Sequence, residues 1–245
     1  MDSGYYAACT ALVSRTQELD TIANNLANAS TVGYRGEENV FSSVLATAGN
    51  QSGSALEEAM NNYGILSGTT VDGTQGALQK TGNNLDLAIE GKGYFVVQTT
   101  GGPMYTRNGG FQVSAKGQLV TSSGDTVMGD RGVIAMPPGQ VAISADGTIS
   151  SNGAVVGNLK VVQFAPGTAL SSMGNGYYSA PANTAKPSTD ASVRQGMLES
   201  SNVNPVASMV ALVTAQRSAE MMQRALSMFN SEIDKTATQD LPKVG

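Results

Sequence analysis

The sequence predicts an α+β fold in which a helix at each end of the chain encloses an inserted all-β domain. Apolar residues recur at three- and four-residue spacing near both ends. Between the ends, short β-branched and aromatic runs alternate with glycine-containing turns. Two stretches join these parts. We interpret residues 36–81, with abundant Gly, Ser, Thr and Asn, as an extended linker, and residues 181–199 as a return linker.

The C-terminal helix is predicted from about Pro205 to Asp234. Asn204 can cap it, and Pro205 suits the first helical position, where a missing N–H costs nothing. One heptad stripe comprises Leu212, Ala215, Ala219, Met222, Leu226, Phe229 and Ile233. A second stripe comprises Val206, Met209, Val210 and Val213. A two-stranded coiled coil needs one stripe, so two stripes indicate a helix packed by several neighbours.

The N-terminal helix is predicted from Met1 to about Asn28. Its stripe comprises Tyr5, Ala8, Leu12, Arg15, Leu19, Ile22 and Leu26, and only Arg15 interrupts the apolar register. Polar residues end the helix, and Gly33 can accept a positive φ. We expect residues 1–35 and 200–245 to form one discontinuous coiled-coil domain, with parallel or antiparallel helices. The alternative is a pair of ordinary amphipathic helices on one globular core.

The β-rich domain is predicted over residues 82–180. Leu85, Leu87 and Ile89 alternate with polar or small residues, which is typical of a half-buried strand. The other expected strands are Tyr94–Val97, Phe111–Val113, Gln118–Val120, Val133–Ile134, Val141–Ile143, Thr148–Ile149, Ala154–Val156 and Leu159–Phe164, the last being the strongest. Asp146-Gly147 and Asn152-Gly153 favour tight type I′ hairpins.

The composition argues against several classes of partner. Charged residues make up 13% of the chain, against about a quarter in ordinary domains, and the net charge is −5. Without a cluster of Lys and Arg, we expect no nucleic acid to bind. No run of eighteen apolar residues and no basic region followed by an apolar run occurs, so we expect neither a membrane span nor a cleaved signal peptide.

The sequence offers no set of catalytic groups. Histidine is absent, which removes the commonest general base and metal ligand. Cys9 is the only cysteine, so no intrachain disulfide is possible, and we expect it in the core. The acidic pairs Glu37-Glu38 and Glu57-Glu58 are interpreted as solvated surface, and Tyr105-Thr106-Arg107 as a packed strand edge rather than a ligand contact. We therefore expect no enzyme, cofactor, metal or small-molecule substrate.

Four segments resemble the bacterial flagellar basal-body rod and hook proteins. The N-terminal signature is Ala23–Asn28 followed by Ser30–Arg35, and the approach to the β-domain is Gln75–Leu78 with Thr81–Ile89. The central strands are Gly93–Val97 and Tyr105–Phe111. The C-terminal signature is Gln195–Asn204 with Met209-Val210 and Ala215–Arg217. The resemblance spans nearly the whole chain in order, but Gly4-Tyr5-Tyr6 and Asn84 depart from the usual family pattern.

The resemblance implies a structural subunit of the flagellar rod that self-assembles helically and transmits torque from motor to hook. It also implies export through the flagellar export apparatus without a cleaved signal peptide, a periplasmic location in the basal body, and contacts with other copies and neighbouring rod proteins. The chain length and Asn62–Leu66 resemble the proximal-rod member most. We expect the assembly interface to include Leu12, Leu19, Ile22, Asn24, Asn25, Leu26, Asn28, Leu212, Ala219, Met222, Leu226, Phe229 and Ile233.

Three other functions stay open at this point. The chain can be a distal-rod or hook-type subunit of the same family. A second class is a carbohydrate- or peptide-binding β-module on a helical stalk, which needs a cleft with exposed aromatic residues, whereas the chain has no Trp and five Phe. A third class is a phage-tail or pilus-like fibre protein.

Overall fold

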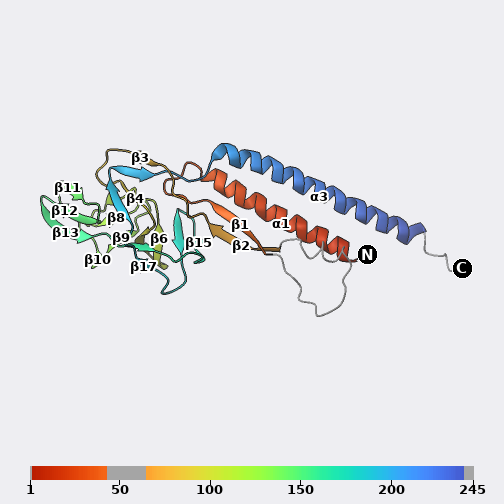
Figure 1. Ribbon diagram of the computed structural model, residues 1–245, viewed down its shortest axis with the longest axis horizontal. Coiled ribbons are helices and arrows are strands. Elements are labelled where there is room, and N and C mark those ends of the chain that lie inside the picture. The colour runs from red at the N-terminus through yellow and green to blue at the C-terminus, as the bar shows by residue number, and fades with distance from the viewer. Residues whose placement is uncertain (1, 43–64, 240–245) are drawn as a thin grey trace. The chain divides into compact units, whose positions relative to one another are not determined.

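The structure is a computed structural model that describes residues 2–42 and 65–239 (Figure 1). Its long helices are α1, Asp2–Ala27, and α3, Pro205–Gln239. The described residues between them contain many short strands. The predicted α+β class is therefore confirmed. The helix α3 begins at the predicted Pro205 and continues to Gln239, beyond the expected end at Asp234.

The chain separates into two compact units. Unit 1 comprises Met1–Leu26, Glu38–Thr69 and Pro205–Gly245, and unit 2 comprises Ala27–Glu37 and Thr70–Asn204. Both units are therefore discontinuous in sequence. The domain boundaries drawn from the sequence differ from these, and they stay a prediction.

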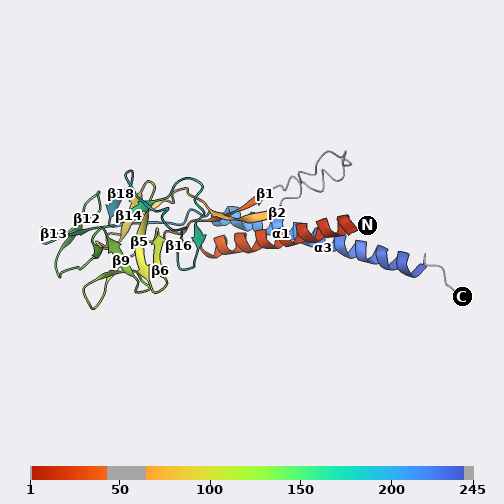
Figure 2. The same cartoon turned by 90° about the horizontal axis from the view of Figure 1, so that it is seen from below.

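Unit 1 contains the two helices. They lie side by side and run antiparallel in both views (Figures 1 and 2). The strands β1, Glu37–Ser42, and β2, Ile65–Val71, form a two-stranded sheet. The hydroxyl of Thr21 on α1 donates to Asn39 Oδ1 on β1 at 3.0 Å. Glu57, Glu58 and Asn62–Gly64, which the sequence analysis named, lie outside the described residues.

The strands of unit 2 pair antiparallel into four sheets. The largest contains β5 (Tyr94–Thr99), β6 (Gly102–Thr106), β7 (Gln112–Val113), β8 (Leu119–Val120), β9 (Thr126–Gly129), β10 (Gly132–Val133), β14 (Val161–Gln163), β15 (Ser171–Ser172), β16 (Tyr177–Ser179) and β17 (Lys186–Pro187). A second comprises β11 (Val141–Ile143), β12 (Thr148–Ser151) and β13 (Ala154–Asn158). The others pair β4 (Leu87–Glu90) with β18 (Ser192–Gln195), and β3 (Leu78–Lys80) with β19 (Met197–Glu199).

One hydrophobic core stabilises unit 2, since burial of apolar surface is the main favourable term in folding. Phe95 and Phe111 pack edge to face in it, with ring centroids 5.1 Å apart. The core residues are Leu87, Ile89, Phe95, Val97, Phe111, Leu119, Val127, Ile134, Met136, Ile143, Ile149, Leu159, Tyr177 and Val193. Most of them come from strands that the sequence analysis predicted, because alternating apolar residues direct one face of each strand inward.

Hairpin geometry follows the predicted turn chemistry at one site and departs from it at another. Asn152 and Gly153 both have positive φ, 51° and 83°, as a type I′ turn requires, so that prediction is confirmed. In the Asp146-Gly147 turn only Gly147 has positive φ, 85°, so the prediction of a type I′ turn there is wrong. The backbone N–H of Ser144 instead donates to Thr148 O at 2.9 Å, which closes a longer loop.

Several strands lie where the sequence analysis placed linkers. Within residues 36–81 the structure has β1, β2 and β3, and within residues 181–199 it has β17, β18 and β19. The last two pair with β4 and β3. Their polar composition reflects short length rather than a lack of pairing, and most of their positions are half-buried. The strand expected at Leu159–Phe164 is shorter than predicted: only Val161–Gln163 forms β14.

Candidate functional site

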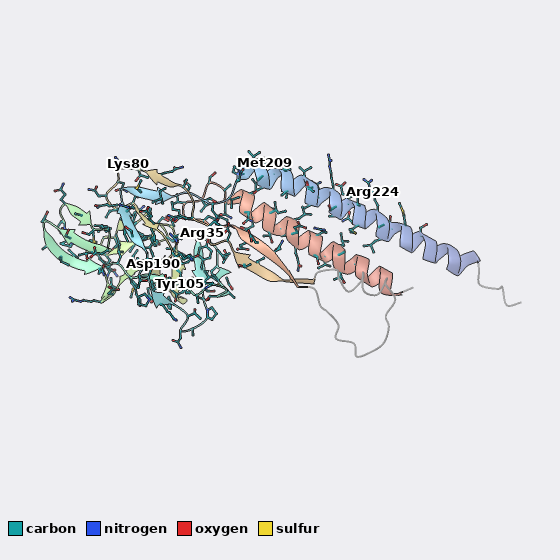
Figure 3. The ribbon with its side chains drawn as sticks, in the orientation of Figure 1. Arg35, Lys80, Tyr105, Asp190, Met209 and Arg224 are labelled. Carbon is teal, nitrogen blue, oxygen red and sulfur yellow. The ribbon has the colours of Figure 1, made fainter. Side chains whose placement is uncertain are left out.

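Three charged side chains are almost completely buried in unit 2. Arg35, Arg107 and Glu199 have exposed fractions of 1%, 3% and 1%. Arg35 Nη2 lies 2.7 Å from Glu199 Oε1, and Arg107 Nη1 lies 3.1 Å from Glu199 Oε2. A buried charge is costly unless it is paired and hydrogen-bonded. We call these three residues the charge cluster; Figure 3 labels Arg35.

Arg35 also holds backbone groups. Its Nη1 donates to Gly73 O at 2.7 Å and to Thr74 O. Its own backbone N–H donates to the hydroxyl of Tyr178 at 2.9 Å. Burial raises the pKa of Tyr178 well above its usual range, so the phenol stays neutral. Arg35 therefore joins the chain that follows α1 to the chain that follows β2 and to β16.

Arg107 follows β6 and faces both Glu199 and an aromatic ring. Its guanidinium donates to Ile89 O at 2.9 Å and to Gly91 O at 2.5 Å, and its Cζ lies 5.5 Å from the ring centroid of Tyr94. Burial lowers the pKa of Arg107 to about 10, and the neighbouring Glu199 partly offsets this effect. Arg107 thus remains charged at neutral pH and balances the carboxylate.

Asn202 extends these contacts towards the start of α3. Its Oδ1 accepts the N–H of Gly36 at 2.8 Å, and its Nδ2 donates to Asp72 Oδ2 at 2.9 Å. The same amide donates to Thr74 O and Thr74 Oγ1, both at 3.1 Å. One side chain therefore ties together the chain after α1, the chain after β2 and the chain before α3.

Two glycines permit the backbones to approach closely around Glu199. Gly33 has φ +67°, as the sequence analysis expected, and a Cβ there would overlap the carbonyl carbon of Arg107. A Cβ on Gly76 would overlap Ser200 O. The N–H of Gly33 donates to Glu199 O at 2.7 Å, and the N–H of Gly76 donates to Glu199 Oε1 at 3.0 Å. Only glycine fits at these two positions.

Sequence reasoning did not identify the charge cluster. It treated Arg107 as part of a packed strand edge, and it named Arg35 and Glu199 only within family signatures. Tyr105 does pack on Phe164, with ring centroids 4.9 Å apart. The composition gives one indication of the cluster. Charged residues are few, so an arginine beside apolar strands is expected to have a nearby carboxylate as its counter-charge.

The first apolar stripe of α3 lies on its covered face. Ala215 and Ala219 are buried, with exposed fractions of 4% and 8%. Leu212, Met222 and Leu226 are half-buried on the same face. Phe229 and Ile233 lie in α3, but their side chains are outside the described part. With 3.6 residues per turn, residues at heptad spacing fall on one side of a helix, and here that side is the covered one.

The second apolar stripe of α3 is uncovered in the single chain. We call Val206, Met209, Val210 and Val213 the exposed α3 stripe; their exposed fractions are 69%, 54%, 64% and 49%. Val206 lies about two and a half turns before Ala215, on the opposite side of the helix. Figure 3 shows Met209 and Arg224 on the edge of α3 that faces away from α1. Towards the C-terminus this side becomes charged, and Glu220 lies 3.9 Å from Arg224.

The buried side of α1 differs from the predicted stripe by one residue. Ala11 and Ser14 are its most buried described positions, at 9% and 8% exposure. Arg15 is exposed and pairs with Glu18 at 2.6 Å. Of the expected interface residues at this end of the chain, Asn24 is exposed. The others are half-buried: Leu12, Leu19, Ile22, Asn25, Leu26 and Asn28. Cys9 is half-buried rather than in the core.

An open pocket of about 600 Å³ lies in unit 2 beside Asn83, Val113 and Pro138. None of its lining residues is aromatic; they are Gly82, Asn83, Asn84, Leu85, Val113, Met136, Pro137, Pro138, Gly139, Gln140 and Val141. Asn83 Nδ2 already donates to Asp86 Oδ1 at 2.9 Å. The pocket thus lacks the exposed aromatic residues that a carbohydrate- or peptide-binding module would need.

Comparison with known proteins places these features in one family. Residues 6–35 match "Flagella basal body rod protein", residues 88–155 match "Flagellar hook protein FlgE/F/G D1 domain", and residues 194–239 match "Flagellar basal body rod FlgEFG protein C-terminal". The chain is 35% identical to the flagellar basal-body rod protein FlgF of Caulobacter vibrioides, over 100% of both chains. This chain belongs to the flagellar basal-body rod protein family.

Other members of the rod family are similarly related. FlgF of Escherichia coli is 35% identical, covering 93% of this chain and 94% of its own. FlgG of Buchnera aphidicola subsp. Baizongia pistaciae is 32% identical, covering 98% and 97%. Each of the three matched segments contains one member of the charge cluster: Arg35, Arg107 and Glu199. Among the described residues, no helix combines the length and hydropathy needed to cross a membrane.

Proposed function

We propose that this chain is a structural subunit of the flagellar basal-body rod, built into it through both terminal helices. The observation that carries the proposal is similarity to rod proteins over the full length, 35% identity with 100% coverage of both chains. The proposed role requires no catalytic group. As a rod subunit it transmits torque from motor to hook, which requires many shared contacts rather than a pocket.

In this proposal the two faces of α3 have different partners. The face with Ala215 and Ala219 packs on α1 of the same chain as an antiparallel coiled coil, because small residues allow close approach of the helices. The exposed α3 stripe packs on neighbouring subunits. Such contacts are heterologous, and heterologous contacts that do not close produce a helical filament. The half-buried Leu12, Leu19 and Leu26 on α1 supply further contact surface.

The proposal also specifies place and partners. The subunit lies in the periplasmic part of the basal body, beside other copies and neighbouring rod proteins. It reaches that place through the flagellar export apparatus without a cleaved signal peptide. Within the rod we propose the proximal position, since FlgF proteins of four different bacteria are 31% to 35% identical to the chain.

The test replaces Val210 with Glu in the chromosomal copy of the source bacterium. Val210 is 64% exposed, so the isolated chain should keep its fold, whereas a carboxylate buried between subunits should block packing. We expect loss of swimming and of the subunit from purified basal bodies. The control is Val155→Glu on β13, which makes the same change at a residue that is 73% exposed. Normal rods in the Val210→Glu strain would refute the assembly role of the exposed α3 stripe.

A further inference from the structure

Two segments of unit 2 lie close in sequence to the terminal helices. We call residues 33–36 the N-terminal flank, because they follow α1, and residues 199–202 the C-terminal flank, because they precede α3. Both flanks belong to unit 2. What holds them in place therefore determines where the chain leaves unit 2 towards each helix.

The flanks bond to each other along the backbone. The N–H of Gly33 donates to Glu199 O at 2.7 Å, and the N–H of Asn202 donates to Tyr34 O at 3.3 Å. The side chain of Asn202 accepts the N–H of Gly36 at 2.8 Å. The two flanks thus form one paired element although they are far apart in sequence.

A third segment, residues 72–77, joins this element from one side. The N–H of Gly76 donates to Glu199 Oε1 at 3.0 Å, and the N–H of Ser200 donates to Ala77 O at 2.9 Å. Arg35 donates to Gly73 O at 2.7 Å. The carboxylate of Glu199 links this segment to both arginines, because it accepts the N–H of Gly76 and pairs with Arg35 and Arg107.

The hydrophobic core does not include these segments. Its fourteen residues run from Leu87 to Val193, and none lies in either flank or in residues 72–77. Apart from the ring of Tyr34, which is 4% exposed, polar contacts and one counter-charge attach the flanks to the rest of unit 2. Regions held by few apolar contacts are the ones that open locally below the global unfolding free energy.

From these contacts we propose that the charge cluster is a latch that holds or releases both flanks together. While Glu199 pairs with Arg35 and Arg107, the chain is fixed at both the N-terminal and the C-terminal flank. When the carboxylate is lost, two buried guanidinium groups lose their counter-charge, and the flanks and residues 72–77 open as one cooperative element. This inference concerns unit 2 alone and does not depend on rod assembly.

Hydrogen exchange of the full-length chain, followed by mass spectrometry, tests the latch. In Glu199→Gln we expect exchange in both flanks and in residues 72–77 to rise together by roughly a hundredfold or more, because breaking a buried ion pair is strongly destabilising. Exchange in β5 and β12 should change far less. The control is Glu90→Gln, which removes an equally short ion pair, 2.6 Å to Arg194, at a position about half exposed. The control should leave both flanks unchanged.

Three outcomes would overturn the latch: no increase in Glu199→Gln, an increase confined to residues 199–202, or the same increase in Glu90→Gln. If Glu199→Gln unfolds all of unit 2, the milder Arg35→Lys replaces it. Lysine keeps the charge but loses the planar fork that spans Glu199 and Gly73 O. We expect that variant to raise exchange in both flanks by a similar factor, and exposure of residues 33–36 alone would also overturn the latch.

Discussion

Removing the hydroxyl of Tyr178 should destabilise unit 2 by a predictable amount. The ring is 1% exposed, and its oxygen accepts the buried backbone N–H of Arg35 at 2.9 Å. Tyr178→Phe keeps the ring, which packs edge on against Tyr94 at 5.7 Å, but leaves that N–H without an acceptor. A buried donor without a partner costs about 1–3 kcal/mol. For a domain of about 150 residues this corresponds to a fall in Tm of about 2–12 °C.

The measurement is thermal unfolding of the full chain, followed by the near-ultraviolet circular dichroism of its tyrosines. The matched control is Tyr105→Phe, labelled in Figure 3. Tyr105 also packs on an aromatic ring, at 4.9 Å from Phe164, and its hydroxyl has no hydrogen-bond partner among the described residues. The control should unfold within about 1 °C of the parent. Equal Tm values for Tyr178→Phe and Tyr105→Phe would show that the buried hydrogen bond contributes nothing.

Two further predictions concern backbone space and pH. Gly33→Ala should lower the stability of unit 2 by about 1–3 kcal/mol in urea titration, because its φ is +67° and a Cβ would overlap Arg107. Gly124→Ala, with φ +88° but open space, should cost less, and an equal loss would contradict the argument from overlap. Burial raises the pKa of Tyr34 to about 12 and raises that of Tyr178 as well, so the unfolded chain loses these protons first. The two protonated phenols stabilise the folded state fully below about pH 10, and this stabilisation is lost as the pH rises to 12. The urea concentration at the unfolding midpoint should therefore fall over that range. A midpoint that stays constant or rises there would contradict it.

The helices and most core strands were predictable because their signals are local. Spacing of three and four residues, with a cap and a proline at Asn204-Pro205, specified the start of α3. Alternation specified β4, and the aromatic and β-branched run specified β5. The Asn152-Gly153 turn was predictable because positive φ at both central residues limits the choice of amino acid.

The charge cluster was not predictable because its members share no local pattern. Long-range contacts bring Arg35, Arg107 and Glu199 together: β19 pairs with β3, and the N-terminal flank bonds to Glu199 O. The polar sequence around β18 and β19 resembles a linker, since strands of four and three residues are too short to show clear alternation. Pairing with β3 and β4, far away in sequence, makes these residues strands, and one sequence carries no signal for such pairing.

The buried side of α1 shows why hydrophobic spacing locates a helix better than it orients it. Spacing selects the largest apolar residues, so it pointed to Leu12 and Leu19. The structure buries Ala11 and Ser14 most deeply, about 100° around the helix from that stripe. Small residues bring helix axes together, whereas leucines pack at the margins of such a contact. Leu12 and Leu19 are only half-buried in the single chain, and in the proposed rod a further subunit covers the rest of their surface.

The contacts of the charge cluster explain why unit 2 buries three charged side chains although the chain has few charges. An isolated buried ion pair can often be replaced by apolar residues without loss of stability. Here the charged groups also satisfy the backbone: Glu199 accepts the N–H of the buried Gly76, and Arg107 donates to Gly91 O. Apolar substitutes would fill the volume but leave these groups without partners, and each such loss costs about 1–3 kcal/mol. Directional bonding to the backbone therefore adds to the attraction between the charges in favouring two arginines and one glutamate at this position.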